Sequence, residues 1–159
     1  MRQYRAFCKT GTLQIAGFWV VLIVLSGEIC TFVEILFQCM NIEEFREYCL
    51  SIKGSTESLP FLNHNILVFK VMDKMFAYIP LEPKDGVFKA DLKCNPDKSV
   101  ELREKYNGIT ETDFKTLMWN LVALESDVPN ELIKELIRHS AEEVIKKLPK
   151  KKQEEYKLL

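Results

Sequence analysis

The stretch that most constrains the fold covers residues 66–80 and reads ILVFKVMDKMFAYIP. Two runs rich in β-branched and aromatic residues flank the charged pair Asp73-Lys74, and a short charged break between two such runs is typical of a β-hairpin. In the first run Lys70 alternates with apolar neighbours, so one face of that strand is expected to look inward and the other to meet water. The sequence therefore predicts a small sheet with this hairpin as its spine.

Patterns on either side of the hairpin predict further elements. Asn41 is a good N-cap, and the apolar residues of 42–52 recur at helical spacing, so a first helix is expected there. Residues 55–65 are polar and contain Pro60, which favours a loop, whereas alternation over 87–93 favours a third strand. The remaining expected elements are a helix over 96–106, irregular chain over 109–116, a largely buried strand over 117–124, a long helix that opens at 126–129 and ends at Pro149, and a frayed charged tail. Together they predict an α+β fold, a small two-layer sandwich in which helices cover one face of a mainly antiparallel sheet.

Length, charge and cysteine content limit the function classes. The chain has 159 residues, 47% of them hydrophobic, which suffices for one core of ordinary size. Its formal net charge is −1, so no overall basic excess indicates nucleic-acid binding. The five cysteines form no CxxC pair and only two histidines accompany them, so we expect reduced thiols in the cytoplasm and neither a disulfide framework nor a metal site.

Residues 1–39 differ in kind from the rest of the chain. A basic start leads into IAGFWVVLIVLSG at 15–27, which is close to the pattern of a signal peptide or signal anchor. The uninterrupted apolar run is about a dozen residues long, against the roughly twenty that span a bilayer. Extending it to Cys39 would place Glu28 and Glu34 at membrane depth, which is costly. Three interpretations remain: an export signal, an N-terminal anchor, or upstream sequence translated from a start codon placed too early.

Several segments after residue 39 resemble the MmcQ/YjbR family of small bacterial proteins. The segments are MNIEEFREYC at 40–49, LVFKVMDKMFAYI at 67–79, LKCNPDKSVELREKYNGI at 92–109, WN at 119–120 and DVPNELIKELIRHSAEEVIKKLPKKKQEE at 127–155. They agree with the family in order and spacing over residues 40–155. The resemblance implies a CyaY-like α+β fold and a DNA-binding protein, and it brings no catalytic residues and no cofactors. Family members typically begin at the methionine that matches Met40, so we expect one domain over 40–159 preceded by an added segment, with a misplaced start codon as the preferred explanation.

The chain departs from the family pattern in one interval. Between the Gly-Ile pair matched by 108–109 and the Trp-Asn pair matched by 119–120, relatives usually carry a Tyr-His-Met-Asn-Lys-Lys-His run. Here the interval reads TETDFKTLM, with Glu111, Asp113 and a single cation, Lys115. Lysine and arginine supply most nonspecific DNA affinity. DNA binding by this chain would therefore depend on other cations.

The candidate nucleic-acid contacts are cationic residues of the predicted sheet, its hairpin and the divergent interval, together with a possible stacking and reading pair. They are Lys70, Lys74, Lys89, Lys93, Lys115, Trp119 and Asn120. The lysines would meet phosphate, the indole would stack on a base, and the amide would read a base edge. The alternative interpretation is an ordinary solvated face with interleaved aspartates, a core tryptophan, and an asparagine amide paired with backbone.

The other chemistry-bearing residues favour structural roles. His64 has no sequence-adjacent nucleophile or carboxylate pair and is expected at the surface. Cys94 precedes a helix N-terminus, which would stabilise its thiolate, so it is the one cysteine whose reactivity merits a test. The lysine cluster over 146–152 complements a helix C-terminus.

No acid/base constellation can be assembled from the sequence, so we do not expect an enzyme. The expected function is noncatalytic binding, with DNA as the partner. The alternative is a protein- or small-ligand-interaction module whose site is the sheet face or residues 109–118. Such a module would be membrane-tethered if residues 13–39 form a genuine anchor.

Overall fold

The computed structural model describes residues 11–15, 18–22, 39–61, 65–113 and 115–159, and its chain divides into two units, Met1–Gln38 and Cys39–Leu159. In the first unit, β1 (Gly11–Ile15) pairs antiparallel with β2 (Phe18–Leu22). The apolar run interpreted as a signal or anchor lies partly in β2 and partly outside the described residues. Within the described ranges, the longest apolar helical stretch falls short of what a bilayer crossing requires.

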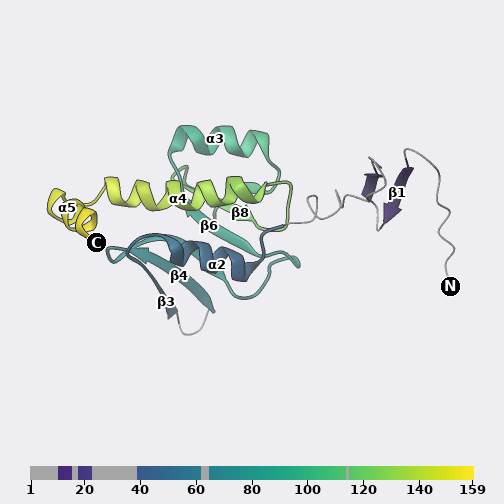
Figure 1. The fold of residues 1–159 in the computed structure, drawn as a ribbon. Helices are drawn as coiled ribbons and strands as arrows, with labels where there is room; N and C mark the ends of the chain where they lie inside the picture. The colour runs from purple at the N-terminus through teal and green to yellow at the C-terminus, as the bar shows by residue number, and fades with distance from the viewer. Residues whose placement is uncertain (1–10, 16–17, 23–38, 62–64, 114) are drawn as a thin grey trace, which may run out of the picture. The chain divides into compact units, whose positions relative to one another are not determined.

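The second unit is built on a six-stranded sheet in which every neighbouring pair is antiparallel (Figure 1). The spatial order is β3-β4-β5-β6-β8-β7. The strands are β3 (Ser55–Phe61), β4 (Ile66–Val71), β5 (Lys74–Pro80), β6 (Lys89–Lys93), β7 (Ile109–Glu111) and β8 (Trp119–Ala123). The hairpin β4-β5 lies inside the sheet with a partner on each side, as expected of its spine.

Four helices accompany this sheet: α2 (Ile42–Ser51), α3 (Pro96–Lys105), α4 (Asn130–Lys146) and α5 (Lys150–Leu158). Helix α4 contacts β4, β5 and β6, while α2 contacts β3 and α4 (Figure 1). The α+β sandwich predicted from the sequence is therefore confirmed. The predicted caps are present too, because the Asn41 side chain accepts the Glu44 amide at 2.8 Å in a capping box and the Asn95 side chain accepts the Asp97 amide at 2.9 Å.

The hairpin turn lies one residue earlier than the sequence indicates. Met72 and Asp73 form it, with φ of 49° and 65°, and Lys74 is already the first residue of β5. Two consecutive positive φ values twist the chain in the sense that suits a two-residue hairpin. The ladder then shifts between the pairs Phe69–Ala77 and Lys70–Met75, which leaves Phe76 as a bulge. Phe76 and Ala77 are both buried as a result.

The prediction of a loop over 55–65 was wrong, because residues 55–61 form β3. This strand pairs with β4 from Ser55 opposite Val71 to Phe61 opposite Ile66, with a register shift after Ser58. It is an edge strand, and only an edge leaves room for Pro60, which has no amide to donate to a second neighbour. Its polar composition reflects the same position, since an edge strand with few buried side chains needs little hydrophobicity.

Two other segments are more regular than the sequence suggests. Residues 109–111, expected to be irregular, form β7 and pair with β8. The tail, expected to fray, forms α5, and the Gln153 side chain donates to the Leu148 carbonyl at 2.7 Å at its start. Helix α4 ends at Lys146, so the prediction that Pro149 closes it was right to within three residues, but the same proline also opens α5.

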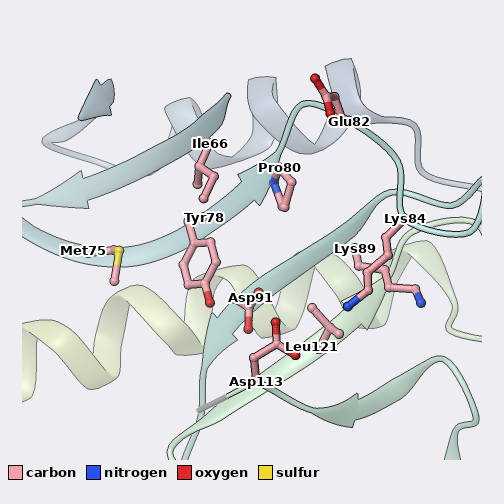
Figure 2. Close-up of a pocket in the computed structure, with 10 residues that line it drawn as sticks. All are labelled: Ile66, Met75, Tyr78, Pro80, Glu82, Lys84, Lys89, Asp91, Asp113 and Leu121. Atoms are coloured by element: carbon pink, nitrogen blue, oxygen red, sulfur yellow. The ribbon is translucent and has the colours of Figure 1, made fainter. Parts of the chain in front are cut away.

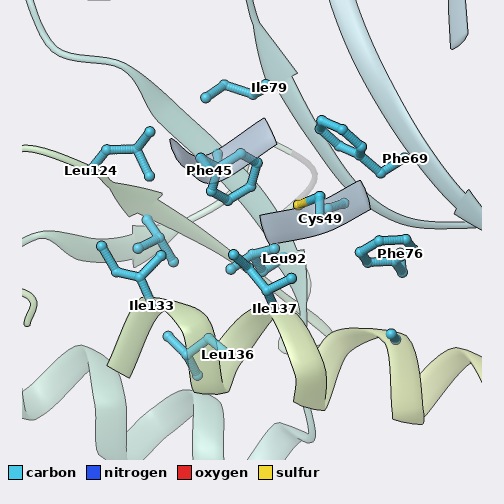
Figure 3. Packing of buried hydrophobic residues seen from close by; sticks show 14 of the residues in the cluster. Phe45, Cys49, Phe69, Phe76, Ile79, Leu92, Leu124, Ile133, Leu136 and Ile137 are labelled. Atoms are coloured by element: carbon cyan, nitrogen blue, oxygen red, sulfur yellow. The ribbon is translucent and has the colours of Figure 1, made fainter. Parts of the chain in front are cut away.

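The core lies between the sheet and the helices α2 and α4 (Figure 3). Phe45 from α2 meets Phe69 from β4 edge-on, with ring centroids 5.9 Å apart and planes at 72°. Ile133 and Ile137 from α4 are fully buried on the opposite side of this cluster. The spacing of four along α4 brings both onto the face that meets the sheet.

Ser140 links α4 to the sheet through two hydrogen bonds. It is fully buried, donates its hydroxyl to the Phe76 carbonyl, and accepts the Lys93 amide at 2.8 Å. We expect Ser140→Ala to lower the free energy of unfolding by about 2 kcal/mol, because it leaves the Lys93 amide and the Phe76 carbonyl without this hydrogen-bond partner. Urea denaturation followed by circular dichroism measures this. Ser51→Ala, which removes an exposed hydroxyl on α2, is the control, and equal midpoints for the two variants would contradict the prediction.

Candidate functional site

The face of the sheet opposite α4, which we call the open face, carries a mixed set of side chains. Strand register fixes this set, because Val68, Tyr78, Asp91 and Leu121 form one row across β4, β5, β6 and β8, and residues two apart in a strand share a face. The open face comprises Ile66, Val68, Lys70, Met75, Tyr78, Pro80, Lys89, Asp91, Lys93, Trp119, Leu121 and Ala123. It thus places aromatic, aliphatic, basic and acidic groups side by side.

A concavity of about 450 Å³ lies on this face (Figure 2). Much of its wall is apolar, and its charged groups converge from β6, from the β5–β6 connection and from the segment after β7. The lining residues are Ile66, Met75, Tyr78, Pro80, Glu82, Lys84, Lys89, Asp91, Asp113 and Leu121. A hollow of this size with an apolar wall and a few convergent polar groups is typical of small-molecule sites.

Asp91 is the most unusual lining residue. Only 5% of it is exposed, and its Oδ1 has no hydrogen-bond partner within the described residues. The phenol of Tyr78 points toward it, and Asp113 lies next to it (Figure 2). Leaving a buried carboxylate oxygen unpaired is costly, so such an atom in a hollow indicates a binding position.

Burial and charge together raise the pKa of Asp91 to about 7. Burial contributes most, the Tyr78 hydroxyl acts in the opposite direction by hydrogen bonding, and the neighbouring Asp113 carboxylate raises the pKa further. Burial and the Asp91 charge likewise raise the pKa of Tyr78. Asp91 can therefore gain or lose a proton near neutral pH, and it can bind a cation or a hydrogen-bond donor.

Comparisons with known proteins give the family. The model of the YjbR family matches residues 50–141, which is more than half of the chain. This chain belongs to the YjbR family. A crystal structure of the Deinococcus radiodurans protein DR2400, with the domain DUF419, has 30% sequence identity and a TM-score of 0.66, and the alignment covers 74% of this chain and 88% of that one.

A second solved structure supports the fold of the YjbR domain. It is a protein from Pseudomonas syringae solved as a structural genomics target, with 24% identity, a TM-score of 0.57, and coverage of 65% of this chain and 97% of that one. No curated protein matches the sequence significantly. The resemblance stated from the sequence is thus confirmed, and these comparisons describe the fold without naming an activity.

Lys70, Lys89 and Lys93 of the YjbR domain share the open face. Lys89 lines the concavity and pairs with Asp85, Nζ to Oδ2 3.6 Å. Lys93 Nζ lies 5.9 Å from the centroid of the Trp119 ring, and its pKa is lowered, first by burial and then by the charge of Lys147. The lysines are therefore together as expected, but acidic groups are interleaved with them.

Lys74 and Lys115 lie apart from that group. Lys74 pairs with Val71 at the end of the hairpin, and Val71 faces the core. Lys115 is exposed in the segment between β7 and β8, with φ of 47°. Of the five candidate lysines, only those on the open face form a common surface by register.

Trp119 and Asn120 point to opposite faces, as successive residues of a strand must. Trp119 is half-buried on the open face, 6.0 Å from Tyr78 between ring centroids, so the interpretation of a core tryptophan was wrong. Asn120 is 1% exposed on the helix side and accepts Arg103 Nε at 2.9 Å. Its partner is thus a guanidinium instead of backbone, and the two side chains do not lie on a common surface.

The remaining candidates that the structure describes do not line the concavity. Cys94 is 3% exposed, and burial raises its thiol pKa in spite of the Ser99 hydrogen bond, which corrects the expected thiolate stabilisation. His64 lies outside the described residues. In the C-terminal cluster, Lys146 pairs with Glu143 at 2.9 Å and Lys152 with Asp73 at 3.7 Å.

Sequence reasoning missed Asp91, Asp113 and Tyr78 as a group. Asp91 was recognised only as a charge interleaved with lysines, and Asp113 only as a departure from the family pattern. Tyr78 and Asp91, 13 positions apart, are joined by the register of β5 and β6, while Asp113 reaches them from the segment after β7, and no local pattern encodes either relation.

Proposed function

We propose that this YjbR domain is a noncatalytic binding module whose ligand occupies the concavity on the open face. The observation that carries the proposal is the buried carboxylate of Asp91, whose Oδ1 has no hydrogen-bond partner among the described residues, in the lining of a 450 Å³ hollow. The aliphatic and aromatic groups around it would contact the body of a ligand, and the carboxylates would orient it. Among the described residues the lining contains no serine or cysteine that could act as a nucleophile, so we assign the Asp91 carboxyl, which can exchange a proton, to ligand binding.

The test compares two lysine substitutions in the full chain. Leu121→Lys puts a long charged side chain into the concavity, whereas Leu117→Lys changes a residue that is 46% exposed and does not line it. Saturation-transfer NMR with indole, benzoate and benzylamine measures binding. We expect at least one probe to bind the native chain and Leu117→Lys, and to lose about tenfold in affinity with Leu121→Lys. Absence of binding by all three probes, or equal binding by the two variants, would overturn the proposal.

DNA is the second candidate partner, because Lys70, Lys89, Lys93 and Trp119 share the open face. Phosphates would meet the lysines and a base would stack on the indole. The acidic groups of the concavity oppose this, and the lysines are fewer than a typical phosphate-binding surface offers. Leu121→Lys separates the two candidates, since an added cation maintains or strengthens DNA affinity while it blocks a small ligand. Electrophoretic mobility shift of duplex and single-stranded DNA at two salt concentrations measures this affinity. If no salt-sensitive shift is observed, DNA is rejected as the partner.

A further inference from the structure

We propose that the concavity takes an organic cation, an ammonium or guanidinium group on an apolar body, with the cationic group held between the carboxylates of Asp91 and Asp113 (Figure 2). This inference rests on the proposed function, because it names the class of ligand for the same site. Free amines and the side chains of lysine or arginine in a peptide share this chemistry.

The acidic pair lacks a protein cation of its own within the described residues. Of the two lysines that line the concavity, Lys89 forms an ion pair among the described residues. Its partner is Asp85, which lies outside the concavity. Asp91 is too buried for water to satisfy it as it would satisfy a surface carboxylate. Two neighbouring carboxylates repel each other, and a cation between them removes the repulsion and supplies donors to the carboxylates.

The composition of the site favours an organic cation over a metal ion. The described residues contain no cluster of three or more His, Cys, Asp or Glu side chains arranged to hold a metal. Ca²⁺ and Mg²⁺ take six or more oxygen ligands, so two carboxylates leave most positions unfilled. An ammonium needs only a few acceptors, and Tyr78 beside the carboxylates, with Met75 further along the lining, suits the alkyl or aryl body that carries it (Figure 2).

Such binding is coupled to a proton. The charged and titratable groups on the same side as Asp91 are Lys70 from β4, Tyr78 from β5, Lys89 and Lys93 from β6 itself, Glu82 and Lys84 from the β5–β6 connection, and Asp113 from the segment after β7. Near neutral pH, Asp91 without ligand is partly protonated. The cation binds the ionised form, so its arrival releases a proton, and its affinity rises as the pH increases through 7.

The experiment uses titration calorimetry on the full chain with benzylamine, benzyl alcohol and benzoate. We expect benzylamine to bind at least about tenfold more tightly than the two others, and to release protons detectable as a heat that changes with the ionisation enthalpy of the buffer. Asp91→Asn is expected to remove this preference and the proton release. Asp73→Asn, which removes a carboxylate that is 95% exposed at the hairpin turn and outside the concavity, is the matched control and is expected to change affinity less than twofold.

The outcomes separate this inference from the proposed function. If the probes bind in the concavity with equal affinity, or if Asp91→Asn still prefers benzylamine, the cation proposal is wrong and the binding module stands. Binding of Mg²⁺ or Mn²⁺ that displaces benzylamine would also overturn it in favour of a metal. An acetyl-Gly-Lys-Gly-amide peptide identifies the source, because tighter binding of the peptide than of benzylamine indicates a protein side chain as the natural ligand.

Discussion

Replacing Arg103 by alanine is expected to lower the free energy of unfolding by about 3 to 4 kcal/mol, because a largely buried guanidinium ties several segments together. Its Nε donates to Asn120 Oδ1 at 2.9 Å, and its Nη2 donates to the carbonyls of Thr116 and Trp119 at 3.1 and 2.9 Å. Its Nη1 also contacts Glu111 at 3.1 Å. Removing the guanidinium leaves the buried Asn120 side-chain oxygen without its donor. It also removes the hydrogen bonds that hold the segment carrying Asp113.

Two companion variants sharpen this result. Arg103→Lys is expected to fall between the native chain and alanine, because a single ammonium cannot reach acceptors on both sides as the planar guanidinium does. Lys105→Ala removes an exposed cation from the same helix and is expected to change stability by less than about 0.5 kcal/mol. Urea denaturation followed by circular dichroism compares them. A loss below about 1 kcal/mol in Arg103→Ala would show that the network contributes little.

Asp91→Asn is expected to stabilise the domain at alkaline pH and to leave it unchanged at acid pH. The folded pKa of Asp91 is raised to about 7, whereas an unfolded aspartate titrates near 3.9. Below about pH 4 the carboxyl is protonated in both states and has no effect on stability. As the pH rises to 7 the unfolded state loses its proton first, so the native free energy of unfolding falls, and the penalty is complete above pH 7. The asparagine variant lacks this penalty and is expected to exceed the native chain by roughly 3 kcal/mol at pH 8.

Thermal and urea unfolding at pH 5, 6, 7 and 8 measure this difference directly. Asp73→Asn is again the control, because its carboxylate is exposed and outside the concavity, so the variant is expected to differ from the native chain by a nearly constant offset. A native chain whose stability does not fall between pH 5 and pH 8 relative to Asp91→Asn would contradict the burial of an unpaired carboxyl. Benzylamine should reduce the difference at pH 8 if the cation proposal holds, since the ligand compensates the charge in the native state.

Local patterns were sufficient for the elements whose stability is local or whose side chains are buried. The hairpin over 66–80 and the caps at Asn41 and Asn95 could be read from residue type and spacing, and the structure places the caps where expected and the hairpin turn one residue earlier. Strand β3 could not be read this way, since its pairing with β4 comes from an edge position that tolerates polar side chains and Pro60. Strand β7 is only three residues long and exists because β8 provides its partner.

The site could be predicted only in part, because a strand pattern reveals alternation but not which alternate residues meet. Alternation placed Lys89 and Lys93 on one face correctly, and the same rule separates Trp119 from Asn120. The hydrophobicity of 117–124 suggested a core strand, but the open face accommodates Trp119 beside Tyr78 instead. The pairing of Asp91 with Tyr78 and its proximity to Asp113 depend on long-range register, which the sequence alone does not specify.

The two edges of the sheet have a consequence for how copies of this protein behave in solution. An unpaired strand offers amides and carbonyls to any extended segment that approaches, and regular edges of this kind lead to aggregation. Here β3 is interrupted by Pro60 and a register shift, and Arg46 forms an ion pair with its Glu57, while β7 offers only three residues. Both edges are thus poor templates for a seventh strand. We therefore expect that the sheet does not add strands from other copies of the protein at high concentration. The binding proposed for the open face would therefore not compete with strand addition at either edge.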